Sequence, residues 1–216
     1  NINADSVNNT SGEILSLGAQ TWQISQDIDN TAGAVQAKRF DITAQNIDNT
    51  DGRIVAVQTT KEVAKNNTSN NSHLQARANL TNADKGVIAS DTGRLTLTAS
   101  RLDNDKGQIS SVNDLSIKTS TLANSGSLYS QGNVDVVNQG KLTNSGSIAA
   151  QGNTIVNTGR LTQTATGQLM AGLTPESKFS NTPSHVTINS TGQQVNAGTT
   201  IATGNIKTQG SELDLT

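Results

Sequence analysis

Residues 122–148 read LANSGSLYSQGNVDVVNQGKLTNSGSI and contain one short phrase twice, starting at Leu122 and at Leu142. The phrase is an apolar residue, any residue, Asn, a short run of small or polar residues, Gly, any residue and a second apolar residue. Other copies start at Val7, Ile28, Ile47, Leu80, Leu102 and, with Gln163 in place of Asn, at Leu161. Successive copies lie about 20 residues apart, with one longer gap, so the chain is built from an internal repeat.

The residues around each copy predict short β-strands. Apolar residues alternate with Thr, Ser, Asn or Lys in stretches such as RLTLTAS and DLSIKTS, and Gly and Asn separate these stretches. A period of two is typical of strands. A unit of about 20 residues is too small to bury its own apolar face, so equivalent strands must stack on one another. We therefore predict an all-β fold, a parallel β-helix (solenoid) of about ten coils with two looped-out insertions.

Three positions of the repeat have predicted structural roles. A glycine at one place in every coil would supply the positive φ of a tight corner. Asparagines would lie above one another at a spacing of about 4.8 Å and hydrogen-bond along the stack. They are Asn9, Asn30, Asn49, Asn82, Asn104, Asn124 and Asn144. An apolar residue before most copies should face inward, namely Ile2, Ile42, Leu97, Ile117, Val137 and Val156.

Two polar segments interrupt the repeat, TTKEVAKNNTSNNSH at residues 59–73 and LTPESKFSNTPSH at residues 173–185. The second segment contains both prolines of the chain, and proline is disfavoured in central strands because it cannot donate a hydrogen bond. The first segment departs from the repeat after Ala56 and the second after Ala171, so both loops should emerge from one face of the rod. We divide the chain into a β-helix at residues 1–171 with an insertion at 59–73, an insertion loop at 172–185, and terminal coils at 186–216.

The repeated phrase followed by an alternating strand, as in LTNSGSIAAQGNTIV from Leu142 and GRLTLTASRLDNDKGQI from Gly93, resembles the filamentous haemagglutinin repeats. This resemblance covers residues 1–170, and it implies a right-handed parallel β-helix in a large exoprotein of a two-partner secretion system. Such exoproteins include contact-dependent growth inhibition toxins, haemagglutinins and adhesins. The resemblance implies a secreted protein or one on the outer-membrane surface of a Gram-negative cell. Its implied partners are an outer-membrane transporter and a receptor on a target cell.

Two features depart from the pattern of that family. The amino-terminal secretion domain, with its Asn-Pro motifs, and a carboxy-terminal toxin are not recognisable, so we expect a fragment of a longer protein. From about Val186, Gly-based steps such as AGTTI, TGNI and QGSEL replace the Asn step and resemble a second class of repeat. Residues 186–216 are therefore expected to mark a boundary between filament segments or to be weaker coils of the same kind.

Composition excludes several classes of function. The chain has 15 basic and 17 acidic residues, scattered singly, and lacks the basic stripe that phosphate backbones attract, so we expect no nucleic-acid partner. No apolar run reaches the roughly 20 residues that cross a bilayer, so we expect no membrane-spanning segment. The absence of cysteine excludes a disulfide framework, a cysteine zinc site and a thiol nucleophile.

An enzyme built on a β-helix, such as a polysaccharide lyase or glycosidase, is the main alternative from another class. It would need acids or bases on one face, and aromatic residues to hold sugar rings. Asp29, Asp48 and Asp103 share the position before the Asn, but other coils carry Asn8, Thr81, Ala123, Thr143 or Thr162 there. The aromatic residues are dispersed along the chain as Trp22, Phe40, Tyr129 and Phe179, with Trp22 expected to be partly buried in an end coil.

The two histidines, His73 and His185, lie at the ends of the insertions and should be too far apart to share a metal ion. We therefore assign no catalytic, cofactor-binding or metal-binding residue, expect no cofactor, and predict that the chain is not an enzyme. The predicted function is a filament stalk that presents a receptor-binding or toxin region to other cells. The alternative is a segment that itself binds a receptor or carbohydrate through its insertions or a strand face, and a polysaccharide-active enzyme is the least favoured reading.

Overall fold

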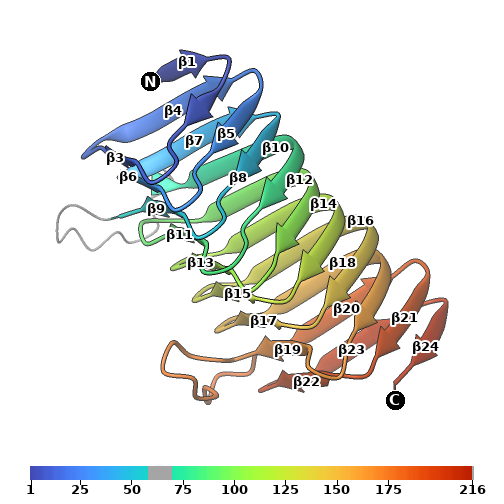
Figure 1. Ribbon diagram of the computed structural model, residues 1–216. Helices are drawn as coiled ribbons and strands as arrows, with labels where there is room; N and C mark the ends of the chain where they lie inside the picture. Colours follow the sequence, from blue (N-terminus) through green and yellow to red (C-terminus); the bar gives the residue numbers. More distant parts are fainter. Residues whose placement is uncertain (58–69, 216) are drawn as a thin grey trace.

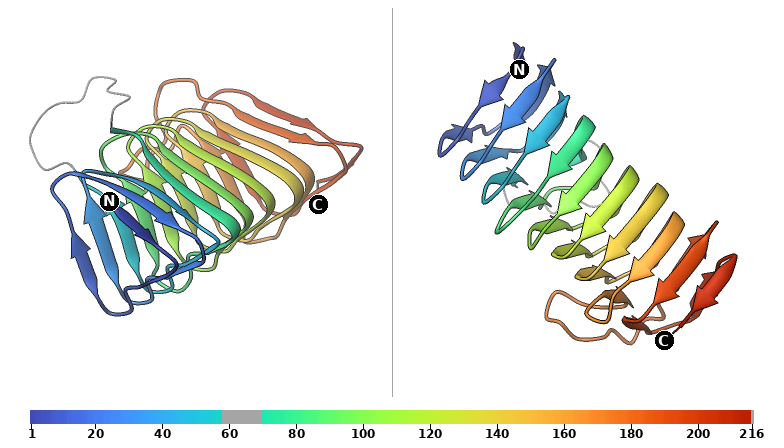
Figure 2. Two further views of the ribbon diagram at one scale, coloured as in Figure 1. Left: turned by 90° about the horizontal axis from the view of Figure 1, so that it is seen from above. Right: turned by 45° about the vertical axis from the view of Figure 1, so that its right-hand side comes forward.

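The computed structural model describes residues 1–57 and 70–215 of the chain. The chain winds into a rod in which about ten coils follow one another from the amino end to the carboxyl end (Figure 1). Each named strand pairs in parallel with its equivalents in the coils before and after it. The predicted all-β parallel solenoid is confirmed, and the stacked coils are seen from two further sides in Figure 2.

The strands form two sheets that run the length of the rod. The larger sheet contains β1 (Ile2–Ala4), β2 (Val7–Asn8), β4 (Ala19–Ile24), β5 (Asp27–Asp29), β7 (Arg39–Ala44), β8 (Asn46–Asp48), β10 (Ser72–Thr81), β12 (Leu95–Asn104), β14 (Leu115–Asn124), β16 (Val134–Asn144), β18 (Thr154–Gln163), β20 (Val186–Ser190), β21 (Gln193–Asn196), β23 (Ile206–Gln209) and β24 (Glu212–Asp214). The smaller sheet contains β3 (Glu13–Leu15), β6 (Ala34–Ala37), β9 (Arg53–Ala56), β11 (Val87–Ser90), β13 (Gln108–Ser111), β15 (Ser127–Ser130), β17 (Ser147–Ala150), β19 (Gln168–Ala171) and β22 (Thr199–Ala202).

One coil consists of a long strand with a bend, a turn, a short strand and a second turn. In β12, the bend lies at Ser100 and Arg101, two consecutive exposed residues that interrupt the alternation of buried and exposed positions. The turn after β12 contains Gly107 and leads into β13. In the first coils, separate strands such as β4 and β5 take the place of the two halves of this long strand.

The core is a stack of apolar side chains from the inward positions of both sheets. Leu95, Leu97 and Leu102 from β12 and Ile109 from β13 are buried, and the equivalent residues of the neighbouring coils lie directly above and below them. Trp22 belongs to the same stack, in register with Ile2 and Ile42, and is 0% exposed. The expectation that Trp22 is only partly buried is therefore wrong, because the aromatic ring fills the interior of the rod.

The turn glycines are present because a side chain would not fit at their position. The prediction that they supply a positive φ is wrong. A Cβ on Gly52 would lie 2.1 Å from the carbonyl oxygen of Asn30, and a Cβ on Gly126 would lie 2.1 Å from that of Gly107. In five coils the positive φ belongs to a residue one or two positions before the glycine: Ser11, Ala32, Asp51, Asp84 and Lys106. From Gly33 onward, the preceding coil therefore approaches the turn too closely for a side chain at the glycine position.

An irregularity in β16 changes one predicted inward residue. The register places Val136, not Val137, in line with Ile117 and Val156. Val136 is 0% exposed whereas Val137 is 38% exposed. The pairing of β16 with both neighbours shifts beyond Asn138, which is the signature of a β-bulge, so counting back from the repeated phrase gave the wrong residue.

The second insertion lies between β19 and β20 and projects from the side of the rod (Figures 1 and 2). Most of the first predicted insertion, residues 59–69, lies outside the described residues, while Ser72 and His73 already belong to β10. Ala56 and Ala171 lie in the same row of inward-facing small residues, five coils apart. This shared row agrees with the prediction that both insertions depart from the coil at the same position of the repeat.

Residues 186–215 continue both sheets. β20 and β21 pair with β18, β22 pairs with β19, and β23 and β24 follow on β20 and β21. The division of the chain at residue 186 into a separate class of repeat stays a prediction.

Candidate functional site

The most extensive polar feature is a ladder of buried asparagine side chains at the end of each long strand. The Nδ2 of each asparagine donates to the Oδ1 of the next, over distances of 2.7 to 2.8 Å. The ladder runs in one direction through Asn9, Asn30, Asn49, Asn82, Asn104, Asn124 and Asn144, as predicted. Each of the six donors also reaches a backbone carbonyl of the turn or of the next coil, for example Asn124 Nδ2 to Ser147 O at 3.1 Å. The ladder therefore holds the turns of neighbouring coils together.

The amide ladder ends at Gln163, the residue that stands in the asparagine position of the next coil. The Nε2 of Gln163 donates to Gly167 O at 3.1 Å and to Thr199 O at 2.9 Å. Its Oε1 is buried and has no hydrogen-bond partner among the residues that the structure describes, and Asn144 Nδ2 bonds to Gln168 O instead. The extra methylene of glutamine moves the amide out of line, so the chain of amide bonds is interrupted at this coil.

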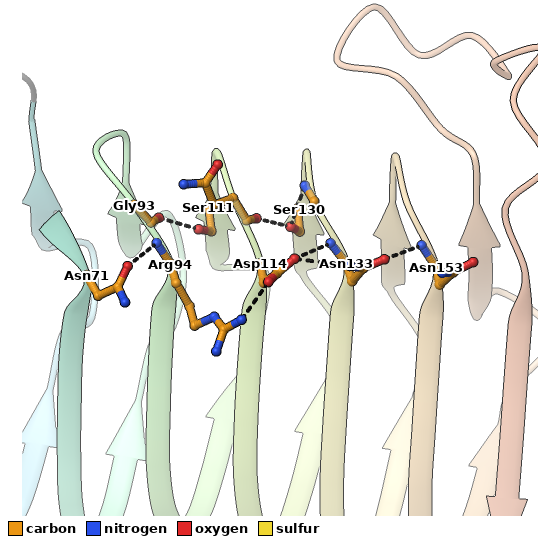
Figure 3. A network of polar contacts seen from close by, with 10 residues as sticks. Asn71, Gly93, Arg94, Ser111, Asp114, Ser130, Asn133 and Asn153 are labelled. Atoms are coloured by element: carbon orange, nitrogen blue, oxygen red, sulfur yellow. Dashed lines mark hydrogen bonds and ion pairs between the residues drawn. The ribbon is translucent and has the colours of Figure 1, made fainter. Parts of the chain in front are cut away.

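A second ladder lies at the corner where the chain passes from the smaller sheet back to the larger one (Figure 3). Here a side-chain oxygen, or in one coil a histidine nitrogen, accepts the backbone N–H of the equivalent residue in the next coil. Asn71 Oδ1 accepts from Arg94 N at 3.1 Å, and Asn133 Oδ1 accepts from Asn153 N at 2.8 Å. The ladder continues past the figure, where Asn153 Oδ1 accepts from His185 N and His185 Nδ1 accepts from Asn205 N, both at 2.8 Å.

Asp114 is the charged member of this corner ladder. Its carboxylate accepts from Arg94 Nη2 at 2.7 Å, from Asn133 N at 3.0 Å and from Asn133 Nδ2 at 3.1 Å. Burial raises the pKa of Asp114, but these hydrogen bonds and the Arg94 charge outweigh burial and hold the pKa below its usual value. Sequence reasoning missed this ladder, although its signal is visible as one polar residue directly before each long strand.

The acidic residues that share one repeat position lie on the outside of the larger sheet. Asp29 and Asp48 are neighbours in the stack, whereas Thr81 separates Asp48 from Asp103. A hydrogen bond from Thr31 N to Asp29 at 2.9 Å lowers the pKa of this carboxyl group. A shallow hollow of about 360 Å³ lies over the acidic pair and is lined by Asp27, Asp29, Asn46, Asp48, Asn79 and Thr81. The lowered pKa of Asp29 makes it a poor general acid, since such a group must be protonated at working pH.

The histidines play separate parts in the rod. His73 lies in β10 with its Nδ1 3.5 Å from Asp41 Oδ1, and His185 belongs to the corner ladder. Across residues 1–57 and 70–215, no group of three or more His, Asp or Glu side chains is placed to bind a metal ion. In the same part of the chain, no helix has the length and apolar character needed to cross a bilayer.

Two surface hollows lie over the bend of the long strands. One, of about 650 Å³, is lined by Val137, Asn138, Gln139, Asn157, Thr158, Gly159, Asn189, Ser190, Thr191, Gln209, Gly210 and Ser211. Its lining contains no aromatic ring and no carboxylate. It therefore lacks the acid pair and the stacking platform that cleavage of a sugar chain requires.

The insertion between β19 and β20 covers part of the outer face of the smaller sheet. Leu173 N donates to Ala150 O at 2.9 Å, and the Tyr129 hydroxyl, two coils earlier than β19, donates to Leu173 O at 3.0 Å. Burial, together with the negative charge of Glu176, raises the pKa of Tyr129. Phe179 lies in the same insertion with 43% of its surface exposed, so the loop is anchored at its base and presents an aromatic ring outward.

These ladders and the apolar stack define a structural β-solenoid in which buried polar groups hold one coil to the next. A family model described as the haemagglutinin repeat matches residues 1–84, 74–146, 112–172 and 178–216. The chain therefore belongs to the haemagglutinin repeat family, as a filamentous haemagglutinin-type repeat region. This is a family of structural and adhesin proteins, not of enzymes. No curated protein and no solved structure matches the chain.

Proposed function

We propose that this chain is a spacer rod of a large bacterial exoprotein, which holds a receptor-binding or toxic region away from the producing cell. The observation that supports this role is the amide ladder, which repeats one inward polar contact through seven consecutive coils. Repetition of one contact provides length and stiffness, whereas a catalytic or ligand site needs different residues brought to one place.

The family supports a secreted or cell-surface protein, and the finer location belongs to the proposal. Export would pass through the outer-membrane transporter of a two-partner secretion system, and the rod would stand on the surface of a Gram-negative cell. The exoprotein would act in adhesion or in contact-dependent growth inhibition. In either activity the rod contributes reach, and the target-cell receptor is bound elsewhere in the exoprotein.

A binding experiment on intact cells tests the spacer role. The purified chain is compared with a variant in which residues 58–69 are deleted and residues 172–184 are replaced by Gln-Gly. In the second change the dipeptide copies Gln151 and Gly152, which connect the equivalent positions one coil earlier. A spacer should bind neither bacterial nor host cells in either form. Saturable binding by the parent that the variant lacks would contradict the spacer role.

The second candidate function is direct recognition through the insertion after β19. The exposed Phe179 ring favours it, because aromatic side chains are enriched in binding surfaces and this loop is fixed at its base by Tyr129. In the same assay, the single change Phe179→Ala separates the two functions. Loss of binding with Phe179→Ala, at unchanged thermal stability, would assign recognition to this loop.

A further inference from the structure

The bends of the long strands form a groove that runs along the rod. One hollow, of about 370 Å³, lies over the bends of β10, β12 and β14 and reaches β16. The hollow of about 650 Å³ described above continues from β16 to residues 209–211. Val137 and Gln139 line both hollows, so the two form one groove, here named the bend groove.

Each coil from β10 to β18 places one base beside the bend groove. Three outward positions flank the bend in each coil: the last outward residue before it, the residue at the bend, and the first outward residue after it. In these five consecutive coils, one of the three positions holds a base and none holds an acid. The bases, all of them exposed, are Arg77, Arg101, Lys118, Lys141 and Arg160.

The five bases form a band in the middle of the rod. They are scattered singly in the sequence, but stacking places them in successive coils about 4.8 Å apart, so the band is about 19 Å long. Beyond the band the charge changes sign. The position that holds Arg101 in β12 holds Asp27 in β5 and Glu212 in β24, with the neutral residues Asn46 and Gln193 in the coils between.

Little of this positive charge is neutralised within the chain. Arg101 forms an exposed ion pair of 3.0 Å with Asp103. The other four bases form no ion pair with any residue of the ranges 1–57 and 70–215. In the outward rows that border the flanking positions of these five coils, the acids are Asp103 and Asp135. Five bases therefore stand against two acids around this part of the groove.

We propose that the bend groove binds a linear acidic polysaccharide that lies along the rod axis. A row of cations at steps of about 4.8 Å favours a polymer whose anionic groups have a similar spacing. Successive sugar rings of an extended uronic acid chain follow one another at nearly this spacing, so one carboxylate can face each coil. This role is independent of the spacer role, because no residue of either insertion lines the groove.

The lining of the groove suits sugar hydroxyl groups. Gln139 and Asn157 contribute amides, which both donate and accept hydrogen bonds. The floor beneath them is fixed by buried side chains. Asn138 Nδ2 donates to Thr119 Oγ1 at 2.9 Å, and Thr158 Oγ1 donates to Asn138 Oδ1 at 3.0 Å. A floor that is already ordered loses little conformational freedom when a ligand binds.

Two other linear polyanions fit the groove less well. An acidic peptide in an extended conformation advances about 3.3 Å per residue, so its carboxylates fall out of step with the coils. Single-stranded nucleic acid is bound by proteins through aromatic side chains that stack on its bases. The residues that line the two hollows include no aromatic side chain. Spacing and lining together therefore favour a polysaccharide.

The interaction should be weak and sensitive to salt. The five bases are exposed, so dissolved ions screen them. Release of counterions from the polymer makes the affinity fall as salt rises, by about tenfold between about 50 mM and about 150 mM for a contact of a few charges. At physiological salt, one rod would therefore lie within a layer of surface polysaccharide without holding a cell by itself.

Fluorescence anisotropy with a labelled oligogalacturonate of about six sugars, enough to span the band of bases, tests the groove at about 20 mM salt. The variant Lys118→Glu/Lys141→Glu should bind at least about tenfold more weakly than the parent. The control Lys38→Glu/Lys85→Glu has the same net charge, is altered at exposed residues outside the groove, and should bind like the parent. All four side chains are exposed, so both variants should melt with the parent. Equal binding by the two variants would overturn the proposal.

Other polymers in the same assay define the ligand and its orientation. Neutral dextran should not bind. Binding of oligogalacturonate assigns carboxylate sugars to the groove, whereas binding of dextran sulfate alone, lost in the groove variant, assigns sulfated sugars. Affinity should rise with length up to about five sugars and change little beyond, because the band then ends. Three results would overturn the proposal: no binding of either acidic polysaccharide, equally tight binding of single-stranded DNA, or an affinity for a disaccharide equal to that for the longer chains.

Discussion

At the scale of single residues, the turn glycine is set by the coil beneath it. From Gly33 onward, the Cβ positions of these glycines overlap backbone atoms of the preceding coil, and the strained φ is carried by other residue types. The glycine therefore does not relieve a bend in its own backbone. It allows two turns to lie at the spacing that the stacked strands demand.

Substitution at Gly126 tests this role of the glycine. Gly126→Ala should lower the free energy of unfolding by about 1–3 kcal/mol, because the new methyl group would displace the Gly107 carbonyl. The control is Gly18→Ala, where the nearest atom is Ser16 Oγ at 3.9 Å, and it should change stability by less than about 0.5 kcal/mol. Urea unfolding of the three proteins measures both values, and equal effects would refute the steric explanation.

The amide ladder predicts effects of opposite sign at two equivalent positions. Asn124→Ala leaves Asn104 Nδ2 without its acceptor and Asn144 Oδ1 without its donor, and should cost about 2–5 kcal/mol. Gln163→Asn should instead raise the melting temperature, because the shorter side chain can accept the bond from Asn144 that Gln163 does not. Thermal unfolding of both variants checks the pair. A destabilised Gln163→Asn protein would show that glutamine is better suited to that coil.

Asp114 gives the corner ladder a dependence on pH. Because the folded-state pKa lies below the unfolded value, the stabilising contribution is fully present above about pH 4 and is lost as the pH falls through the folded pKa. In Asp114→Asn, the amide keeps the acceptor for Asn133 N but cannot titrate. As the pH falls below about 4, the melting temperature of the parent should fall more steeply than that of Asp114→Asn. Parallel curves would exclude the carboxylate as the cause.

At the scale of the strand, the bulge in β16 shows where sequence reasoning stops. The repeat phrase located every asparagine of the amide ladder and most core positions, because each is fixed by its distance from the turn. Val136 and Val137 are both apolar, and a bulge leaves no mark in such a pair. The corner ladder was missed for a different reason, since Asn71, Asp114 and His185 share a hydrogen-bonding role without sharing a residue type.

Aspartate substitution distinguishes the two valines of β16. Val136→Asp should prevent stable folding of several coils, because an unpaired charge would be buried between stacked strands. Leu122→Asp in the neighbouring coil should have the same effect, since Leu122 is also buried. Val137→Asp is the matched control and should melt close to the parent. Circular dichroism on heating compares the three, and a tolerant Val136→Asp protein would reverse the assignment.

At the scale of the whole molecule, the rod should tolerate the removal of one complete coil. Deleting residues 102–121 joins Arg101 to Leu122, which occupy successive positions of the same register. Nearest-neighbour stacking predicts that the shortened rod still folds, with a length reduced by about 4.8 Å. Deleting residues 102–111 removes half a coil and should abolish folding, because every later strand changes partners. Small-angle scattering and circular dichroism test both deletions.

The direction of the hydrogen bonds also decides how the rod would respond to a pulling force. Both the strand pairings and the amide ladder run along the rod axis, whereas the strands lie across it. Tension applied to the two ends would therefore break the contacts between coils one after another, and not all of them together. Each released coil of about 20 residues could extend from about 5 Å to about 68 Å. A tether built from such coils would lengthen stepwise under load and limit the force reaching whatever it holds.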